Sequence, residues 1–415
     1  MPTFLGNPLS NTRPLVGAVS RSADKLDIFA VADDGNVYTA AWEPDFRSWH
    51  GWYLIGGATF PPGAPVYAVS RSADKLDIFA ADIYGNILTS AWEPGFTQWS
   101  TWRQVANGAA SPGAHVTAVS RSTDKLDIFV VGTDHTVYTA AWEPDFGQGN
   151  WHGWYVIGAA ALPLGVATFP PGTPVHAISR STDKLDIFAV NDNFGAIVPS
   201  IVGTIMTSAW EPGFTQWSTW RQVANGAASP GAHVTAVSRS TDKLDIFVVS
   251  PDLKQPHGGG PGIDGLVFTA AWVPDFGADW HGWWPAYMAP ELVTAVSDGN
   301  PIAAISRSKD KIDIFACGYV FSASGGGPPS AHGVLTSAWP PLPPFNISWE
   351  WKLVAGGNQN FDPGDISSQP PVTAVSRNTD KLDIFFVGTD GNVWTAAWEP
   401  DFGQGNWHGW WSIGT

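Results

Sequence analysis

The six-residue stretch Asp-Lys-Leu-Asp-Ile-Phe is the feature that most restricts the fold of this chain. It occurs six times unchanged and once as Asp-Lys-Ile-Asp-Ile-Phe, at residues 24–29, 74–79, 124–129, 183–188, 242–247, 310–315 and 380–385. Each copy follows a short apolar segment that ends in Ser-Arg-Ser or Ser-Arg-Asn, and each precedes an aromatic block such as Thr39–Pro44. Seven copies of one unit predict a repeat architecture in which neighbouring units complete one another's cores.

Each repeat has the sequence pattern of four short antiparallel strands. In the first repeat we expect strands at residues 17–20, 26–32, 37–42 and 52–56, which carry β-branched, aromatic and small apolar residues. Residues 21–25 are predicted to form a polar turn. Asp33–Asn36 contains Asp-Gly, which is typical of a two-residue hairpin connection, and Pro44 ends the third strand. Four strands in roughly 50 residues predict an all-β fold, a seven-bladed β-propeller with four antiparallel strands per blade.

We expect the whole chain, residues 1–415, to form one propeller domain. The repeats cover approximately residues 16–57, 65–108, 115–158, 174–226, 233–285, 302–357 and 371–415. Residues 1–15 precede them as an N-terminal arm or a closing strand.

One face of the disc is predicted to vary and the other to be regular. The longer repeats carry their extra residues in the second hairpin turn (Asn191–Gly203, Ser250–Gly265, Gly318–Gly333) or in the crossover to the next blade (Ala159–Gly172, Ala286–Pro301, Gly356–Pro371). Both connections lie at the same end of the strands. The opposite end carries the Ser-Arg-Ser turn and the Trp-Glu-Pro loop, which barely change in length.

The repeats also alternate between two types. The odd-numbered repeats contain Trp-His-Gly-Trp, at Trp49–Trp52, Trp151–Trp154, Trp280–Trp283 and Trp407–Trp410. The second and fourth contain Trp-Ser-Thr-Trp, within Thr89–Val105 and Thr207–Val223, and the sixth is a diverged relative of these. Two kinds of inter-blade pocket are therefore expected. Because seven is odd, the last and first repeats are both of the first type and meet at a junction unlike the others.

Charge and cysteine content exclude several classes of function. The formal net charge is −16, with 21 basic against 37 acidic residues, which disfavours nucleic acid and anionic membranes as partners. No apolar run approaches the roughly 20 residues of a membrane helix, so no membrane insertion is expected. The single cysteine, Cys317, leaves no intrachain disulfide and no cysteine-based metal site. We expect no cofactor and no metal-ligating residues, although a metal in the central channel stays open. We also expect a protein that is cytoplasmic or released without a signal peptide. Homo-oligomerisation stays open.

No enzymatic activity is expected. The chain has no Gly-x-Ser-x-Gly, no His-Glu-x-x-His and no glycine-rich phosphate loop after a strand. Its carboxylates repeat from blade to blade, whereas a glycosidase needs one pair of catalytic acids.

The regular face instead combines side chains that suit a sugar. An indole offers a flat apolar surface to the C–H face of a pyranose, and charged side chains hold the hydroxyls around its rim. Several weak sites on one rigid disc would bind a glycan-coated surface by avidity. The candidate carbohydrate-binding residues are Arg21, Glu43, Trp49, His50, Arg71, Glu93, Trp99, Arg121, Glu143, Trp151, His152, Arg180, Glu211, Trp217, Arg239, Trp280, His281, Arg377, Glu399, Trp407 and His408.

These positions also have structural interpretations. Arg21 and Glu43 either contact a ligand or form a salt bridge between the two turns, and the sequence favours neither. Asp27 is expected to be an acceptor that fixes a strand or turn, and Trp42 to pack between blades. Trp49 and its neighbouring histidine lie in a loop, which slightly favours ligand contact. Val273 and Pro340 stand where the fifth and sixth repeats would carry the glutamate, so those two sites are expected to be weak or inactive.

The sequence resembles the bacterial and fungal β-propeller lectins, especially the seven-bladed lectins of Photorhabdus type. Their blades carry an (R/K)LD(V/I)F strand, a Gly-Thr-Asp turn, an aromatic strand and a Trp-Gly-Trp-like closing stretch. The matching stretches here are Lys125–Asp134 and Lys381–Asp390, each followed by Trp-His-Gly-Trp, and the resemblance covers about Gly17 to Thr415. It implies fucose- or galactose-type sugars bound between neighbouring blades. A related fungal group recognises terminal N-acetylglucosamine.

The sequence therefore predicts a multivalent lectin for terminal monosaccharides of the fucose or galactose type, or for N-acetylglucosamine, with glycans and glycoproteins as partners. The alternative is a propeller scaffold that binds protein partners through the variable, insertion-bearing face.

Overall fold

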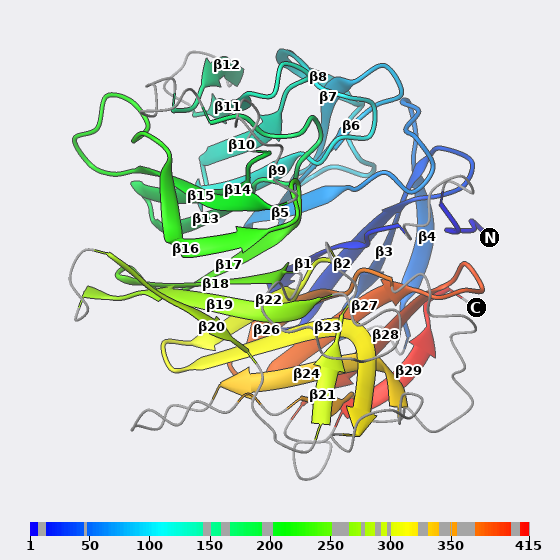
Figure 1. Ribbon diagram of the computed structural model, residues 1–415. Helices are drawn as coiled ribbons and strands as arrows, with labels where there is room; N and C mark the ends of the chain where they lie inside the picture. The colour runs from blue at the N-terminus through cyan, green and yellow to red at the C-terminus, as the bar shows by residue number, and fades with distance from the viewer. Residues whose placement is uncertain are drawn as a thin grey trace.

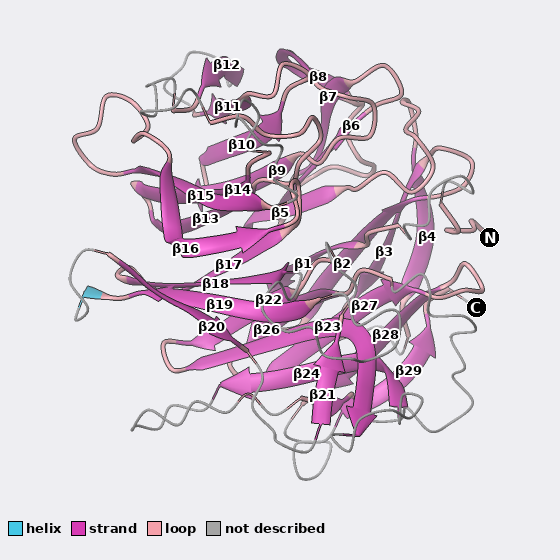
Figure 2. Ribbon diagram, viewed as in Figure 1, coloured by secondary structure: helices cyan, strands magenta, loops and turns pink. Residues whose placement is uncertain are grey.

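The structure is a computed structural model, and strands make up most of it (Figure 2). It describes residues 1–6, 14–44, 48–143, 151–158, 167–192, 202–250, 265–274, 279–286, 292–296, 300–322, 331–339, 349, 351–354, 370–399 and 407–414. Among these residues no helix is long and apolar enough to span a membrane.

The predicted seven-bladed propeller is confirmed: seven antiparallel sheets surround a central axis (Figure 1). Blade 1 contains β1 (Gly17–Ser22), β2 (Lys25–Val31), β3 (Val37–Trp42) and β4 (His50–Ile55), and blade 2 contains β5 (Tyr67–Ser72), β6 (Lys75–Ala81), β7 (Asn86–Trp92) and β8 (Arg103–Ala109). Blade 3 contains β9 (Thr117–Ser122), β10 (Lys125–Val131), β11 (Val137–Trp142) and β12 (Trp151–Val156), and blade 4 contains β13 (His176–Ser181), β14 (Lys184–Val190), β15 (Gly203–Trp210) and β16 (Arg221–Ala228).

The remaining blades follow the same order, with one extra strand in the sixth. Blade 5 contains β17 (Val234–Ser240), β18 (Lys243–Ser250), β19 (Leu266–Trp272) and β20 (Trp280–Pro285). Blade 6 contains β21 (Leu292–Ala295), β22 (Ala303–Ser308), β23 (Lys311–Ser322), β24 (Ala331–Trp339) and β25 (Lys352–Leu353). Blade 7 contains β26 (Thr373–Asn378), β27 (Lys381–Val387), β28 (Val393–Trp398) and β29 (Trp407–Ser412). The innermost strand of each blade contacts that of the next, and β26 contacts β1, so the ring is closed.

The hydrophobic core lies between the blades. In β2, Leu26 and Ile28 pack with Phe385 of blade 7, whereas Phe29 packs on the opposite side with Ile78 of blade 2. Side chains of a strand alternate between its two faces, so the Leu-Asp-Ile-Phe stretch supplies apolar groups to both neighbours. A single blade would leave both of these faces in water, at a cost of roughly 2 kcal/mol for each large side chain.

In five blades a tryptophan side chain on the outer part of the blade donates a hydrogen bond to the preceding blade. The indole N–H of Trp52 donates to the carbonyl of Ile413 at 3.1 Å, and that of Trp102 donates to Ile55 at 3.2 Å. The same bond recurs from Trp154 to Val105, from Trp220 to Ile157 and from Trp351 to Ala286. The junction between blades 7 and 1 therefore has the same indole hydrogen bond as four other junctions, although its loop sequences differ from theirs.

The N-terminal residues complete the junction between blades 7 and 1. The Phe4 amide donates to the carbonyl of Gly391 at 3.0 Å, and the carbonyl of Thr3 accepts the Asp33 amide at 2.8 Å. The Phe4 ring is buried, 4.8 Å from the Trp52 ring between centroids.

Two internal crossovers show the same arrangement. Phe60 donates to Gly35 and packs 4.9 Å from Trp102, and Phe169 donates to His135 and packs 4.8 Å from Trp220. Residues 3 and 4 therefore take the place of a crossover between the last blade and the first.

The second hairpin turn of the blade is longer than the predicted two-residue connection. The Ala32 amide bonds to the carbonyl of Asn36 at 2.9 Å, so residues 32–36 form the turn. Gly35 has a φ of 77°, and a Cβ there would lie 2.8 Å from the carbonyl oxygen of Phe60. The glycine thus allows the next crossover to approach the turn, a long-range contact that the local Asp-Gly signal does not reveal.

Blade 6 differs from the expected pattern in two places. The predicted insertion Gly318–Gly333 partly extends the β23–β24 hairpin, with Val320 opposite Ala331. The predicted crossover Ala286–Pro301 contains β21. This strand pairs with residues 319–322 of β23, whereas β22 pairs with residues 311–315 of the same strand. A long exposed strand gains backbone bonds from such an added neighbour. Most of the other predicted insertions lie outside the described residues.

Candidate ligand sites between blades

One arginine per blade lies on a β-bulge at the end of the innermost strand. In blade 1, Ser20 pairs with Leu26 and Ser22 pairs with Lys25, which leaves Arg21 as the extra residue. A bulge re-aims the side chain that it displaces. The same register shift is present in all seven blades and singles out Arg21, Arg71, Arg121, Arg180, Arg239, Arg307 and Arg377.

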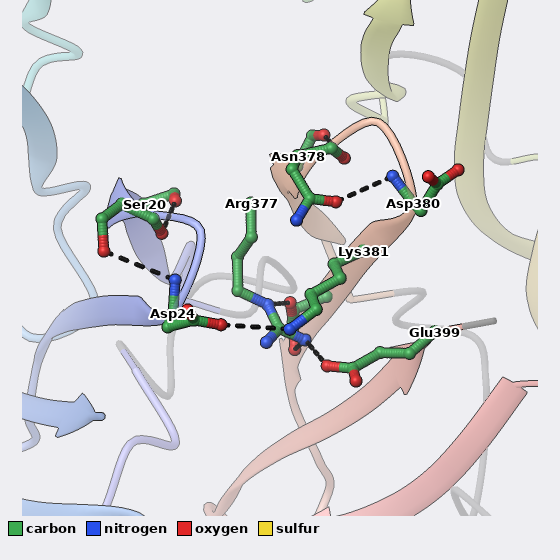
Figure 3. A network of polar contacts seen from close by, with 10 residues as sticks. Ser20, Asp24, Arg377, Asn378, Asp380, Lys381 and Glu399 are labelled. Atoms are coloured by element: carbon green, nitrogen blue, oxygen red, sulfur yellow. Dashed lines mark hydrogen bonds and ion pairs between the residues drawn. The ribbon is translucent and has the colours of Figure 1, made fainter. Parts of the chain in front are cut away.

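The Ser-Arg-Ser sequence explains this local geometry. The Ser20 hydroxyl donates across the bulge to the carbonyl of Ser22 at 2.8 Å. The Ser22 hydroxyl accepts the Asp24 amide at 3.4 Å and so begins the following turn. In blade 7 the Asn378 side chain replaces the second serine and accepts the Asp380 amide at 2.8 Å (Figure 3). The strand therefore reaches two residues further than the sequence predicted, and the arginine lies within it instead of in the turn.

Each arginine is held by the buried aspartate of the repeated motif. Arg21 Nε donates to Asp27, and Arg377 Nε donates to Asp383 Oδ2 at 2.6 Å. Burial raises the pKa of Asp27 to about 6, while the paired guanidinium opposes this shift. The carboxylate is thus ionised at neutral pH and fixes the arginine, which agrees with its predicted role as an acceptor.

Five of the arginines also contact the glutamate that follows the third strand. The Nη2–Oε1 distance is 2.9 Å for Arg21–Glu43, 2.9 Å for Arg71–Glu93, 2.6 Å for Arg121–Glu143, 2.9 Å for Arg180–Glu211 and 2.5 Å for Arg377–Glu399. The arginine side chains are almost fully buried, whereas the glutamates are more exposed, up to 39% for Glu93. The salt bridge, one of the two interpretations that the sequence left open, is therefore present, and its glutamate is the more exposed partner.

The next blade forms the opposite wall. We call the place between blades 1 and 2 site I, and continue to site VII between blades 7 and 1. The guanidinium carbon of Arg377 lies 5.0 Å from the ring centre of Trp42, which belongs to the third strand of blade 1. Equivalent contacts join Arg71 to Trp142, Arg180 to Trp272 and Arg307 to Trp398, at 4.9–5.3 Å. Trp42, Trp142, Trp272 and Trp398 thus lie at the blade interface, as predicted, and an arginine of the preceding blade covers each of them.

The lysine of the repeated motif distinguishes two groups of sites. In sites I and III, Lys25 and Lys125 lie 3.7 Å from the glutamate of their own blade. In site VII, Lys381 reaches across to Asp24 of blade 1 at 3.0 Å (Figure 3), and Lys184 is 3.8 Å from Asp242 in site IV. The division follows the type of the second blade at each site, which is the blade that forms the opposite wall. That blade is of the Trp-Ser-Thr-Trp type in sites I and III, and of the Trp-His-Gly-Trp type in sites IV and VII.

The tryptophans proposed from sequence as ligand contacts also pack across the interface. The ring of Trp49 meets Phe385 of blade 7 edge-on at 5.6 Å between centroids. The same contact is made by Trp99, Trp151, Trp217, Trp280 and Trp407, each with the phenylalanine of the preceding blade. These six tryptophan residues nevertheless remain only half-buried. His50, His152, His281 and His408 lie at the start of the outermost strand, half-buried or exposed.

The structure adds residues that the sequence did not single out. Arg307 belongs to the ring of arginines, and its Ser-Arg-Ser signal at residues 306–308 was readable, but its blade lacks the glutamate. The interface tryptophans Trp42, Trp142, Trp272 and Trp398 supply a wall that was assigned to packing alone. Pro340 lies outside the described residues. Within the described ranges no group of three or more His, Cys, Asp or Glu side chains is placed to hold a metal ion.

Solved structures provide the comparisons with known proteins. No protein-family model matches the chain, and no curated protein matches it. A lectin of Burkholderia pseudomallei (BP39L) is similar at 20% identity over 99% of both chains, with a TM-score of 0.68. The lectin of the fungus Aleuria aurantia, described as a six-bladed propeller that recognises fucose, matches at 14% identity over 100% of this chain and 99% of its own, with a TM-score of 0.52. At these identities the likeness establishes the shared propeller fold.

Proposed function

We propose that the protein is a multivalent lectin that holds neutral terminal monosaccharides between its blades. The observation that carries this proposal is the pairing of a fixed arginine with a more exposed glutamate, in five copies on one face. In three of these five sites the arginine also lies over an indole of the next blade. Among the described residues the carboxylates of the sites repeat from blade to blade, and we propose binding without hydrolysis.

The geometry suits the recognition of a sugar. The glutamate carboxylate accepts hydrogen bonds from two adjacent hydroxyls, and the guanidinium donates to ring or hydroxyl oxygens. Indole edges and faces from the next blade cover the C–H groups of the ring. Because the aspartate already fixes the arginine, little conformational entropy is lost when the ligand binds.

Fucose is the first sugar to test. The Aleuria aurantia lectin, 13% identical and with a TM-score of 0.52, is seen in complex with Fucα1-6GlcNAc and, in another structure, with α-methyl-L-fucoside. Fucose combines three hydroxyls with an apolar methyl group, which matches a site of one ion pair and several aromatic side chains. Galactose-type sugars and N-acetylglucosamine are the alternatives that the same site chemistry permits.

Avidity follows from the placement of the sites. All the arginines lie at the end of the innermost strands, on the regular face, so several sites can engage one glycan-coated surface together. Linked sites of this kind raise apparent affinity by roughly 10²–10⁴ without any new contact.

Calorimetric titration of the full chain with methyl α-L-fucoside, methyl galactoside and N-acetylglucosamine tests the proposal. We expect one of these sugars to bind with a stoichiometry near five, the number of arginine–glutamate pairs. Glu93→Gln should lower that number by one, and replacing all five glutamates should abolish binding. Asp34→Asn is the control, because Asp34 lies in an exposed hairpin turn on the opposite face, where it bonds Tyr38. Failure of every neutral sugar and neutral glycan to bind would refute the proposal.

A further inference from the structure

The seven blades differ systematically at one position of the outermost strand. In each blade a threonine of the third strand stands opposite one residue of the outermost strand, which we call the outer residue of that blade. The seven outer residues are, in blade order, Tyr53, Arg103, Tyr155, Arg221, Trp284, Lys352 and Trp411. All seven are exposed. Odd-numbered blades thus carry an aromatic outer residue, and even-numbered blades carry a basic one.

In blade 2 the outer residue lies on the face that this blade turns towards blade 3. Thr89 stands opposite Phe79 in one neighbouring strand and opposite Arg103 in the other. Directly opposite residues of antiparallel strands share one face of the sheet. The Phe79 ring meets Trp151 of blade 3 edge-on at 5.6 Å between centroids. The equivalent residues of site IV are Phe188, Thr207 and Arg221 of blade 4, with Trp280 of blade 5. Arg103 and Arg221 therefore belong to the same blade faces as sites II and IV.

The outer residue is near the arginine–glutamate pair of the same site. Asp77, which holds Arg71, precedes Phe79 by two residues in β6 and therefore shares its face of the sheet. Two residues along the strand and two strand spacings outward place the Cα atoms of Asp77 and Arg103 roughly 12 Å apart. A terminal sugar held by Arg71 and Glu93 would therefore leave Arg103 beside the next residue of the glycan.

Arg103 and Arg221 differ from the other described arginines in having no polar partner. The structure describes nine arginines, and seven of them are the bulge arginines, each bonded to its aspartate. Within the described ranges neither Arg103 nor Arg221 makes an ion pair, a hydrogen bond or a ring contact. The neighbouring glutamates, Glu93 and Glu211, are bonded to the bulge arginines of their own blades. Two guanidinium groups beside ligand sites are thus free to receive an anionic group of the ligand.

The backbone that carries Arg103 is fixed before a ligand binds. The buried Ser90 hydroxyl donates to the carbonyl of Ser100 at 2.7 Å, and the Ser100 hydroxyl accepts the Ala91 amide at 2.9 Å. The indole of Trp102, the residue before Arg103, is bonded to the preceding blade. Blade 4 repeats these bonds with Ser208, Ser218, Ala209 and Trp220. The serines that distinguish this type of blade therefore position its arginine, which lowers the entropy lost on binding.

Site VII provides an internal comparison for sites II and IV. In all three sites the second blade is of the Trp-His-Gly-Trp type, and the bulge arginine bonds a glutamate. In all three the guanidinium also lies over a tryptophan of the second blade, at 5.0–5.3 Å. The outer residue is Arg103 in site II and Arg221 in site IV, but Trp411 in site VII. The three sites thus share the contacts that would hold a terminal sugar and differ at the outer residue.

We propose that sites II and IV bind glycans that carry an anionic group, a sulfate or a carboxylate, on the residue next to the terminal neutral sugar. This inference rests on the proposed lectin function and names a ligand class for two of its sites. Arg103 and Arg221 donate charge-assisted hydrogen bonds to the anionic group, while the arginine–glutamate pair holds the terminal sugar. In sites I, III and VII the aromatic outer residue offers an apolar surface to a neutral second sugar. The alternation of the blades thus distributes two kinds of glycan around one disc.

Matched disaccharides isolate the anionic group. Fucα1-3GlcNAc and Galβ1-4GlcNAc are each compared with the form that carries a 6-sulfate on GlcNAc, and GlcNAcβ1-4Glc is compared with GlcNAcβ1-4GlcA for the carboxylate. Each is titrated into the full chain by calorimetry. In the pair with the favoured terminal sugar, we expect the anionic member to bind about tenfold more tightly at two sites, as a charge-assisted hydrogen bond would give. This advantage should shrink as salt rises from low to physiological strength.

Exchange of the outer residues provides matched variants. Arg103→Tyr and Arg221→Tyr together introduce the residue that blades 1 and 3 carry at this position, and they should abolish the preference for the anionic disaccharide. Trp411→Arg should create a third site with this preference, at site VII. Lys309→Gln is the charge control, because it removes one positive charge from an exposed turn of blade 6 and should leave the preference intact.

Three results would overturn the inference. They are equal affinity within every pair, a preference that survives in the variant with both arginines replaced, and a change of that variant's oligomeric state in sedimentation velocity. The last result would show that the outer residues serve contact between copies of the chain. Absence of binding by every neutral sugar would instead refute the lectin function itself, so the two failures are distinguishable.

Discussion

Three histidines from consecutive blades cluster at the start of the innermost strands, and they should make the propeller sensitive to acid. His115 precedes β9, His176 begins β13 and His233 precedes β17, which are neighbouring strands of the inner ring. The rings of His115 and His233 meet edge-on at 4.8 Å between centroids. Burial lowers the pKa of His115 and of His176 to about 4, and burial together with the other two imidazoles lowers the pKa of His233 well below its usual value.

The sign of the effect follows from the direction of these shifts. As pH falls below about 6.5, the unfolded chain takes up protons on these histidines before the folded chain does. The contribution of these histidines to stability is therefore fully present above that pH and is lost as pH falls towards 4. A shift from 6.5 to about 4 corresponds to about 3 kcal/mol for each of His115 and His176. Because these two residues are only half-buried and solvent screens their exposed part, we expect the pair to contribute about 4 kcal/mol.

A triple variant, His115→Gln, His176→Thr and His233→Gln, isolates this contribution. Threonine is the natural residue at the position of His176 in blades 3, 5 and 7 (Thr117, Thr235 and Thr373). The free energy of unfolding of both chains is measured by urea titration at pH 7, 6, 5 and 4. The buried aspartates titrate in both chains, in the opposite direction because burial raises their pKa, and cancel in the difference. Wild type should lose at least about 4 kcal/mol more than the variant between pH 7 and pH 4, because the lowered pKa of His233 adds to the contribution of the pair. Parallel losses in the two chains would refute the reasoning.

Two further predictions concern the closure of the ring and the separate roles of the two ion pairs within a site. Phe4→Ala should lower the free energy of unfolding, measured by urea titration, by about 3–5 kcal/mol, the same as Phe60→Ala. Both rings are buried between an outer tryptophan and a hairpin turn. A much smaller cost for Phe4→Ala would show that the N-terminal residues do not close the ring. Arg71→Met leaves Asp77 buried without its partner and should cost about 3–5 kcal/mol, whereas Glu93→Gln should cost less than about 1 kcal/mol, since that carboxylate is partly exposed. Equal destabilisation by the two substitutions would contradict this separation of a structural ion pair from a ligand-facing one.

The repeated sequence predicts the fold and the position of the candidate sites better than it predicts the arrangement of side chains within each site. Seven copies of a strand with apolar residues on both faces require neighbours on both sides, so the propeller and the interfaces between blades were predictable. The bulge at Arg21 was not, because Ser-Arg-Ser reads locally as a turn. Only the pairing of Ser20 with Leu26 and of Ser22 with Lys25 shows that the arginine is the extra residue.

The two classes of tryptophan show the same limit. Trp42 and Trp49 are both aromatic residues near one loop, and the sequence does not state which one an arginine of the previous blade will cover. That depends on the register of β3 against β2, in which Trp42 stands opposite Leu26. The N-terminal segment was ambiguous for a related reason: its Thr-Phe pair matches Thr59–Phe60 and Thr168–Phe169, but two residues are too short a match to be recognised without the bonds that they make.

Ring closure by residues 3 and 4 has a practical consequence for how the disc can be attached to something else. Both described ends lie side by side (Figure 1) and next to the second hairpin turns, at the insertion-bearing end of the strands. The arginines lie at the other end. A linker joined to either terminus would therefore leave the whole ligand-facing rim pointing away from the support. The same chain could be displayed on a bead, a sensor chip or a larger carrier protein in one defined orientation, with every site turned towards the solution.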